Sequence, residues 1–573
     1  MAGLSRRVLT GLLMVAPAGL LPAGLSAEPL ETGVSIPSDS GEPDIVAAAR
    51  RNDLEGVRPH LRHRRQVNAR GADQATALIW ASANRNLEMA DLLLKAGADP
   101  DAVNEYGVGA LDLAASNDDV PLIRRLLEAR ANPDVARWSG ETPLMLSARA
   151  GSVTAIDLLV AAKADVDHAE RHGQTALMWA AAAGHAEAVR HLLAAGADPK
   201  LATPVVTVDY LGGGWGHRME TTPITAGGWA PIHFAVESGD IPTVQALLDA
   251  GVGIESRTEE GETPLIISLY HHVQRVVKPP YDTEVVGDLP MADYLLGKGA
   301  DVNGASRSGL TPLHAAVFIA AGKDRWSYAL DEDPAVTPHD EEGAAAVRLL
   351  LAHGADPNLR ITDHRVLVPG GLNRHHAEYR NITPFLLAGA LYKDAIQQMM
   401  LDSGRIDVHA RNAEGETLLM EAAMLNIVKT AQMLIERGAD VNATDRQGRT
   451  ALHFAAMQPL IGSVRSGYPD TYGPRGGGDM ARLLLASGAT KDVRDAEGRT
   501  PLAIASLDWP KEGRFTGNIV ENAPQVDGYF FEENEPSRNF SPPARRLSAR
   551  AVLDGTAQDA AADPRAPQMV SAH

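Results

Sequence analysis

The side chains best suited to chemistry gather in one stretch, residues 359–381. They are His364, His375, His376, Asp363 and Glu378. Imidazole and carboxylate groups bind transition metals, but the spacing of these residues matches no established ligand motif. A second stretch, residues 204–226, has a similar order of Gly-Gly, His, Glu and Thr-Pro. The two stretches could build a metal-dependent or catalytic site, form a ligand-contacting loop, or share only the chemistry of turns.

Other signatures of catalysis are missing from the sequence. It has no G-x-S-x-G, no H-E-x-x-H and no dinucleotide fingerprint. Without cysteine it can form neither disulfides nor thiolate metal sites. We therefore expect a protein that is not an enzyme, and we assign no catalytic residue, no metal ligand and no cofactor.

The rest of the chain is organised by a pattern that is clearest in residues 173–200, GQTALMWAAAAGHAEAVRHLLAAGADPK. Thr175 can cap a helix N-terminus with its hydroxyl, and small apolar residues at three- and four-residue spacing follow it. Gly184 and Gly196 each supply the positive φ that ends a helix. One unit is therefore a helix, a turn, a second helix and an extended finger that leads to the next unit.

This unit recurs at a fixed period of 33 residues. The Thr position marks consecutive copies at Thr76, Gly109, Thr142 and Thr175, and further pairs at Ala230 and Thr263 and at Thr417 and Thr450. The spacing widens where loops are inserted. These insertions lie near 204–226, 271–290, 319–342, 359–381 and 459–478. Because repeat arrays accept additions only in loops, the insertions are candidate functional segments.

The motif TPLHAA, at residues 311–316, and the motif GADVN, ending at Asn303 and Asn442, resemble those of the ankyrin repeat family. The resemblance implies an all-α ankyrin-repeat solenoid of about eleven to twelve helix-turn-helix units with long loop insertions. It also implies that His233, His314 and His453 form hydrogen bonds within the repeat turns. Trp80, Trp179, Phe234 and Phe454 share one phase of the repeat and are expected in the core.

The sequence predicts four segments along the chain. They are a signal peptide at 1–27, a polar linker at 28–43, the repeat solenoid at 44–508 with a degenerate first repeat, and a mostly disordered tail at 509–573. The first segment has an Arg pair, an apolar run and small residues before Ala27. We therefore expect an exported bacterial protein, periplasmic or secreted, with no membrane span after cleavage.

A formal net charge of −20 argues against a nucleic-acid partner, since phosphate binding needs a basic face. No clustered Lys/Arg stripe is evident on inspection of the sequence. We expect the partner to be another protein, whose identity the sequence leaves open.

By resemblance to the family, the partner-contacting positions are the fingertips and the ends of the first helices. They are Tyr106, Trp138, Arg171, His172, Trp215, Trp229, Tyr270, His271, Phe318, Tyr379 and Arg380. Aromatic and Arg residues are typical of interface hot spots. We therefore expect a non-enzymatic scaffold that binds a protein along a concave face and its finger loops. The alternatives are the metal-dependent or catalytic site in the His-containing insertions and a scaffold that recruits its partner through the tail.

Overall fold

The computed structural model describes the chain in ten segments. They are residues 42–211, 221–269, 271–273, 284–286, 288–321, 338–362, 381–391, 393–457, 478–506 and 552–553. The chain divides into two compact units, one up to Arg307 and the other from Ser308. Each unit is an array of paired helices and is described by itself.

The repeat unit predicted from residues 173–200 is confirmed. The Thr175 hydroxyl accepts a hydrogen bond from the backbone N–H of Met178 at 3.4 Å and starts helix α11 (Ala176–Ala182). Gly184 follows this helix with φ of 68°. Helix α12 (Ala186–Ala194) comes next, and Gly196 follows it with φ of 97°. Both glycines adopt the left-handed conformation that a side chain would disfavour.

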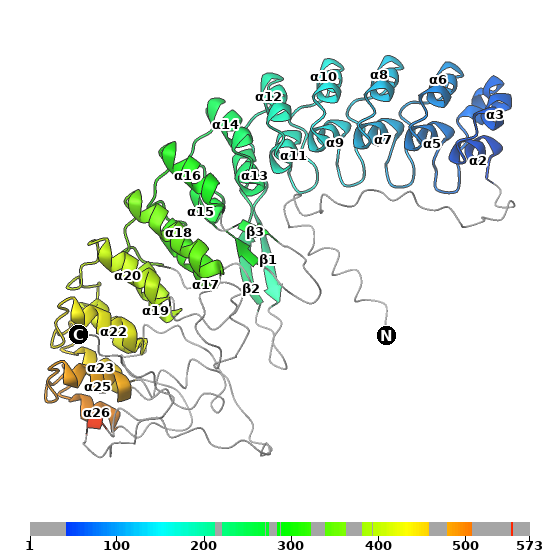
Figure 1. The fold of residues 1–573 in the computed structure, drawn as a ribbon. Helices are drawn as coiled ribbons and strands as arrows, with labels where there is room; N and C mark the ends of the chain where they lie inside the picture. The colour runs from blue at the N-terminus through cyan, green and yellow to red at the C-terminus, as the bar shows by residue number, and fades with distance from the viewer. Residues whose placement is uncertain are drawn as a thin grey trace, which may run out of the picture. The chain divides into compact units, whose positions relative to one another are not determined.

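In the first unit the helices form two layers (Figure 1). The first helices of successive repeats are α5 (Ala77–Ala83), α7 (Ala110–Ser116), α9 (Pro143–Ala150), α11, α13 (Pro231–Ser238) and α15 (Pro264–Leu269). The second helices are α6 (Leu87–Lys95), α8 (Val120–Glu128), α10 (Val153–Ala161), α12, α14 (Ile241–Asp249) and α16 (Leu289–Gly297). Each first helix packs on its own second helix and on the first helices of neighbouring repeats.

Small residues permit this close packing of the first helices. Ala180 and Ala181 of α11 are both fully buried, and α11 lies between α9 and α13. Leu192 of α12 is also fully buried and closes the space between the two layers. Burying such a leucine contributes roughly 2 kcal/mol, so the core of each repeat is a thin layer completed by its neighbours.

The first repeat is degenerate, as the sequence predicts. Its first helix is α2 (Asp44–Arg50), and the place of a single second helix is taken by three short turns. These turns are α3 (Leu54–Val57), η1 (Arg58–Arg62) and α4 (Arg64–Val67). Only Val57 and Val67 of the three turns are buried, so most of their side chains face solvent, as suits the end of an array.

The fingers of the first unit are joined by backbone hydrogen bonds from one repeat to the next. The N–H of Trp138 donates to the carbonyl of Tyr106 at 3.4 Å, and the N–H of Arg171 donates to the carbonyl of Ser139 at 3.1 Å. Further along, the N–H of Arg307 donates to the carbonyl of Glu260 at 2.8 Å. The fingertips are thus fixed to one another as well as to their own helices.

Two of the insertions in the first unit contain antiparallel strand pairs, which the sequence analysis did not predict. Strand β1 (Val206–Leu211) pairs with β2 (Thr221–Ala226), with Val206 opposite Ala226. Along the chain this pair comes between α12 and α13. A shorter pair, β3 (His271–Val273) with β4 (Glu284–Val286), lies between α15 and α16. The paired helices still make up the array itself.

The second unit repeats the same architecture. Its first helices are α17 (Pro312–Ala321), α19 (Pro384–Ala390), α21 (Leu418–Met424), α23 (Ala451–Ala456) and α26 (Pro501–Ala505). Its second helices are α18 (Pro338–Ala352), α20 (Asp394–Asp402), α22 (Val428–Glu436) and α25 (Gly478–Ala486). The helices α17 and α18 extend into the insertion near 319–342 from both sides.

The predicted signal peptide and almost all of the predicted linker lie outside the described residues. So does most of the predicted tail. Within the tail, residues 552 and 553 have helical conformation, and Leu553 is only 5% exposed. Across the described part of the chain, no helix combines the length and the apolar character needed to cross a bilayer.

Candidate partner-binding surface

Tyr106 and Trp138 form an exposed aromatic pair on neighbouring fingertips. The two side chains are 60% and 64% exposed, and their ring centroids lie 6.3 Å apart with the planes inclined at 59°. A hydrogen bond with the neighbouring Glu105 carboxylate raises the pKa of the Tyr106 hydroxyl. Large aromatic side chains held in this way offer apolar area to a partner at little entropic cost.

The close approach of these two fingers depends on Gly107. Its φ is 77°, and a Cβ atom at this position would lie 2.9 Å from Cδ1 of Trp138 and 3.0 Å from its backbone nitrogen. Any larger residue would push the second finger away. The aromatic pair therefore requires the glycine between Tyr106 and the next helix.

Arg137, next to Trp138, ties the same fingertip to helix α7. Its guanidinium donates to the Ser116 hydroxyl at 2.9 Å and to the Glu141 carboxylate at 3.1 Å. Its Nε lies 3.8 Å from Oδ1 of Asp112, a carboxylate that is fully buried. These contacts hold the backbone that presents Trp138.

Sequence reasoning missed this cluster. Asp112 occupies the position where other repeats carry the histidine of the TPLH motif, and it accepts a hydrogen bond from the N–H of Gly109 at 2.8 Å. Burial raises the pKa of Asp112 to about 6, against the lowering effect of that hydrogen bond and of Arg137. The only sign in the sequence was the departure from the motif at Gly109 and Asp112. The structure accounts for it, because Arg137 on the next finger lies near the Asp112 carboxylate.

Arg171 and His172 lie on the following fingertip, and both are exposed. His172 Nδ1 is 2.9 Å from Oε2 of Glu170, so its ring is held against its own finger. The guanidinium of Arg171 has no hydrogen-bond or ion-pair partner in the described part of the chain. A free cation thus follows the aromatic pair along the line of fingertips.

Trp229 occupies a different environment from Tyr106 and Trp138. It is half-buried, with its ring 5.3 Å from that of Phe234 and 6.0 Å from that of His233. Its backbone exchanges hydrogen bonds with Thr203 at the base of the inserted finger. Trp229 therefore closes the joint between finger and helix, and only part of its ring faces solvent.

Of the remaining predicted contact residues, Phe318 is the one whose side chain the structure describes. Phe318 is only 4% exposed within α17, so its ring packs in the core and the expectation of a partner contact there is corrected. The sequence could not distinguish the two cases because the end of a first helix can face either way. His271 belongs to strand β3, but its side chain lies outside the described part. Trp215, Tyr270, Tyr379 and Arg380 also lie outside the described residues.

The recurring histidines have the structural role implied by the family pattern. In His233, Nδ1 accepts from the N–H of Ala230 at 2.9 Å, and Nε2 lies 3.1 Å from the carbonyl of Ser256 in the next finger. Burial lowers the pKa of His233 to about 4 and that of His314 to about 3. These rings are neutral links between a first helix and the finger that ends the same repeat.

Of the aromatic residues that share the repeat phase, Trp179 is 6% exposed and Phe234 and Phe454 are each 3% exposed. These three are core residues, as predicted. Trp80 is half-buried instead. The guanidinium of Arg50 lies 5.2 Å from the Trp80 ring, and that of Arg149 lies 5.1 Å from the Trp179 ring. Cations from the preceding repeat thus cover the faces of both rings.

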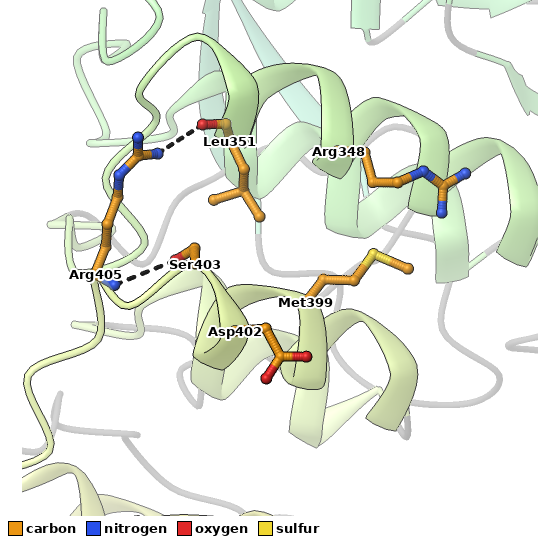
Figure 2. Close-up of a pocket in the computed structure, with 6 residues that line it drawn as sticks. All are labelled: Arg348, Leu351, Met399, Asp402, Ser403 and Arg405. Atoms are coloured by element: carbon orange, nitrogen blue, oxygen red, sulfur yellow. Dashed lines mark hydrogen bonds between the residues drawn. The ribbon is translucent and has the colours of Figure 1, made fainter.

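A pocket of 410 Å³ lies in the second unit, between the second helices α18 and α20 (Figure 2). It is lined by Arg348, Leu351, Met399, Asp402, Ser403 and Arg405. Arg405 donates to the carbonyl of Leu351 at 2.7 Å, and Asp402 pairs with Arg437 at 2.6 Å. The Arg405 and Asp402 side chains are thus occupied in contacts between neighbouring repeats, and the Ser403 hydroxyl donates to the carbonyl of Met400 at 2.6 Å.

Residues 363–380, with the His and acidic side chains considered for a metal, lie outside the described residues. Among the residues that are described, no three His, Asp or Glu side chains are grouped so as to hold a metal ion. The metal-dependent alternative therefore stays a prediction from sequence.

The chain matches two family models. One, of three ankyrin repeat copies, matches residues 45–137, 111–203 and 385–465, and the other, of many ankyrin repeat copies, matches residues 287–322. The chain is an ankyrin repeat protein. Its fold is an all-α ankyrin repeat array, as predicted. Ankyrin repeats are in general protein–protein interaction modules and typically non-catalytic.

Comparison with solved structures gives a match to the crystal structure of the human ASB11 ankyrin repeat domain. This ankyrin repeat protein is 20% identical to that domain, with a TM-score of 0.32, over 39% of this chain and 89% of the other. No curated protein sequence matches.

Proposed function

We propose that this ankyrin repeat protein is a non-enzymatic scaffold that binds a partner protein along the fingertips of its first unit. The observation that carries the proposal is the exposed pair of Tyr106 and Trp138, held on adjacent fingers by a backbone hydrogen bond. Isolated apolar side chains on a surface are ordinary, but two aromatic rings in contact are typical of an interface anchor.

The surroundings of the pair support this role. Arg137 holds the second finger against helix α7, and the free guanidinium of Arg171 lies on the next finger. Rigid aromatic groups flanked by an unpaired Arg suit a protein surface with an apolar side chain and a nearby carboxylate. Such a site needs no cofactor and performs no reaction.

The experiment is a crosslinking pull-down that compares the wild type with a Tyr106→Ala/Trp138→Ala variant. Because both side chains are largely exposed, the variant should keep its helicity and its unfolding temperature. The matched control is Leu87→Ala/Arg124→Ala, which removes an exposed apolar residue and an exposed arginine from the second helices α6 and α8.

A protein enriched by the wild type and the control, but lost with the aromatic variant, would support the proposal. Equal enrichment by all three would overturn it for these fingertips. In that case the insertions at 204–226 and 359–381 become the next candidates, and metal analysis of the purified protein tests their alternative role.

We further propose that the protein is exported, to the periplasm or the medium, because its first 27 residues have the charge and apolar pattern of a signal peptide. Fractionation of cells that express the full chain, compared with a variant lacking residues 2–27, tests this. Equal retention of both in the cytoplasm would contradict export.

A further inference from the structure

Four exposed arginines lie close together along the chain in the second half of the degenerate first repeat. Arg58 and Arg62 belong to turn η1, and Arg64 and Arg65 belong to α4. All four side chains are exposed, while Val57 and Val67 on either side of them are fully buried and anchor the segment. These four residues are called the arginine strip. They correct the expectation that the sequence has no cluster of basic residues.

The strip is mostly free of internal partners. Arg58 pairs with Glu55 at 2.9 Å and with Glu88 at 3.4 Å. In the part of the chain that the structure describes, no carboxylate pairs with Arg62, Arg64 or Arg65. The arrangement one repeat further on is different.

There, on helices α6 and α8, Asp91 is paired with both Lys95 and Arg125. Its acidic and basic side chains thus neutralise one another, whereas most of the arginine strip stays unpaired. Three uncompensated cations in so short a segment produce a local positive field that single surface arginines do not produce.

The length of the strip follows from its contacts with helix α6. Arg58 reaches Glu88, in the first turn of α6. Arg64 lies over Gly97, just after the other end, where a Cβ atom would be 3.6 Å from its Nε. The nine residues of α6 span about 14 Å, so Arg58 and Arg64 lie near opposite ends of this helix. An extended chain covers this distance with about four residues.

We propose that the arginine strip binds a short acidic segment, rich in Asp or Glu, of a partner protein. The guanidinium group binds carboxylates through paired hydrogen bonds, and it loses hydration more readily than an ammonium group. This surface is separate from the fingertips that carry Tyr106 and Trp138, so the inference goes beyond the proposed function.

The charge of the whole chain favours a short ligand. The protein carries −20, so a long polyanion or an anionic membrane lying on the strip would also meet acidic surface. At physiological salt the Debye length is about 8 Å, so a segment confined to the strip is screened from most of that surface. Nucleic acid and lipid therefore serve as the competing ligands in the test.

The test uses the chain without residues 1–27 and a fluorescent peptide with four consecutive glutamates. The affinity of this peptide is measured by anisotropy at about 50 and about 150 mM salt. A peptide with glutamine in place of glutamate shows whether charge is required. The strip variant is Arg62→Ala/Arg64→Ala/Arg65→Ala. Its control, Arg124→Ala/Arg190→Ala/Arg482→Ala, removes the same charge from dispersed exposed positions.

The strip variant should bind the glutamate peptide about tenfold more weakly than the wild type, and the control less than about twofold more weakly. Binding by the wild type should weaken at the higher salt concentration. The Tyr106→Ala/Trp138→Ala variant should bind this peptide as well as the wild type, so this test and that of the fingertips can fail independently.

Equal losses in the strip variant and its control would overturn the proposal. So would binding of a short DNA duplex, or of vesicles containing anionic lipid, through the strip when the glutamate peptide does not bind. A variant that keeps the charge, Arg62→Lys/Arg65→Lys, excludes unfolding of the first repeat as the cause. The lysine variant should bind the glutamate peptide more tightly than the alanine variant does. If it binds the peptide no better, and the unfolding temperatures of both variants fall equally, the result would contradict the proposal.

Discussion

The Nε atom of Arg137 lies 3.8 Å from Oδ1 of the buried Asp112. This contact connects the fingertip of Trp138 to helix α7, which directly follows the fingertip of Tyr106. The same guanidinium bonds to Ser116 and Glu141, so one side chain braces the finger of Trp138 against helix α7. The proposed binding surface is therefore supported by a residue next to it whose role the repeat pattern does not indicate.

Replacing Arg137 by Ala should lower the stability of the first unit by about 2 kcal/mol, because Asp112 and Glu141 lose their cation and a half-buried hydrogen-bond network is broken. Thermal unfolding followed by circular dichroism measures the change. The control is Arg124→Ala, at an exposed position of α8, which should leave the unfolding temperature nearly unchanged. Equal unfolding temperatures of the two variants would contradict the bracing role.

The substitution Asp112→Asn should change how stability depends on pH. Burial raises the folded-state pKa of Asp112 to about 6, so the folded protein binds this proton more tightly than the unfolded chain does. Stability from this group is thus present at low pH and is lost as the pH rises from about 4 to about 6. The loss is up to about 3 kcal/mol.

Asn does not titrate and can still accept the hydrogen bond from the N–H of Gly109. The variant should therefore become more stable relative to the wild type as the pH rises. The measurement is the difference between the two unfolding temperatures at a series of pH values from about 4.5 to 7. A constant difference across this series would show that Asp112 has an ordinary pKa.

His233 gives the opposite dependence on pH. Burial lowers its folded-state pKa to about 4, so its contribution to stability is complete above about pH 6.5 and falls as the pH drops from there toward 4. Protonation of Nδ1 would break the hydrogen bond from the N–H of Ala230. The His233→Met variant tests this, since Met145 and Met178 occupy the same position of other repeats.

At neutral pH the His233→Met variant should be about 1–3 kcal/mol less stable than the wild type, because two hydrogen bonds are lost. This gap should narrow as the pH is lowered to about 5, since only the wild type then loses stability through this position. Thermal unfolding at both pH values measures the gap. If the stability gap widens as the pH is lowered, this would contradict the conclusion that burial lowers the pKa of His233 and keeps its ring neutral.

The substitution Gly107→Ala should weaken partner binding although both aromatic side chains remain. The added methyl group would lie 2.9 Å from Cδ1 of Trp138 and forces the two fingers apart. Retention of the partner in the pull-down should fall toward that of the Tyr106→Ala/Trp138→Ala variant.

The control for this substitution is Gly251→Ala, at a glycine with φ of 85° and no atom within 4 Å of the added Cβ. Both substitutions carry the cost of a positive φ, about 1 kcal/mol, but only the first one moves a fingertip. Equal partner retention by the two variants would show that the spacing of the fingers does not matter.

Much of the fold could be predicted because the residues that start and end the helices recur in each repeat. Thr175 marks the start of a helix, and Gly184 and Gly196 mark the ends of two. The strand pair β1–β2 was not predicted, because residues 204–226 do not follow the repeat period from which the helices were predicted. Backbone pairing of that kind depends on which segments meet in space.

The candidate site could be predicted only in part. Tyr106 and Trp138 were found because their place in the repeat implies a fingertip, and both are exposed. Phe318 was wrong as a contact residue, since its position is compatible with either face of a first helix and packing placed it in the core. Arg137 was missed because its partners Asp112 and Ser116 lie on helix α7, and the repeat pattern does not indicate a contact between that helix and the finger.

The sequence by itself determined the repeat, the all-α array and the structural role of the recurring histidines, because all three follow from local residues at a constant period. Only the tertiary structure decided that Tyr106 and Trp138 touch, that Asp112 is buried beneath Arg137 and that most of the arginine strip is unpaired. The physical reason is that these contacts join different helices and fingers. Their distances depend on how neighbouring repeats pack.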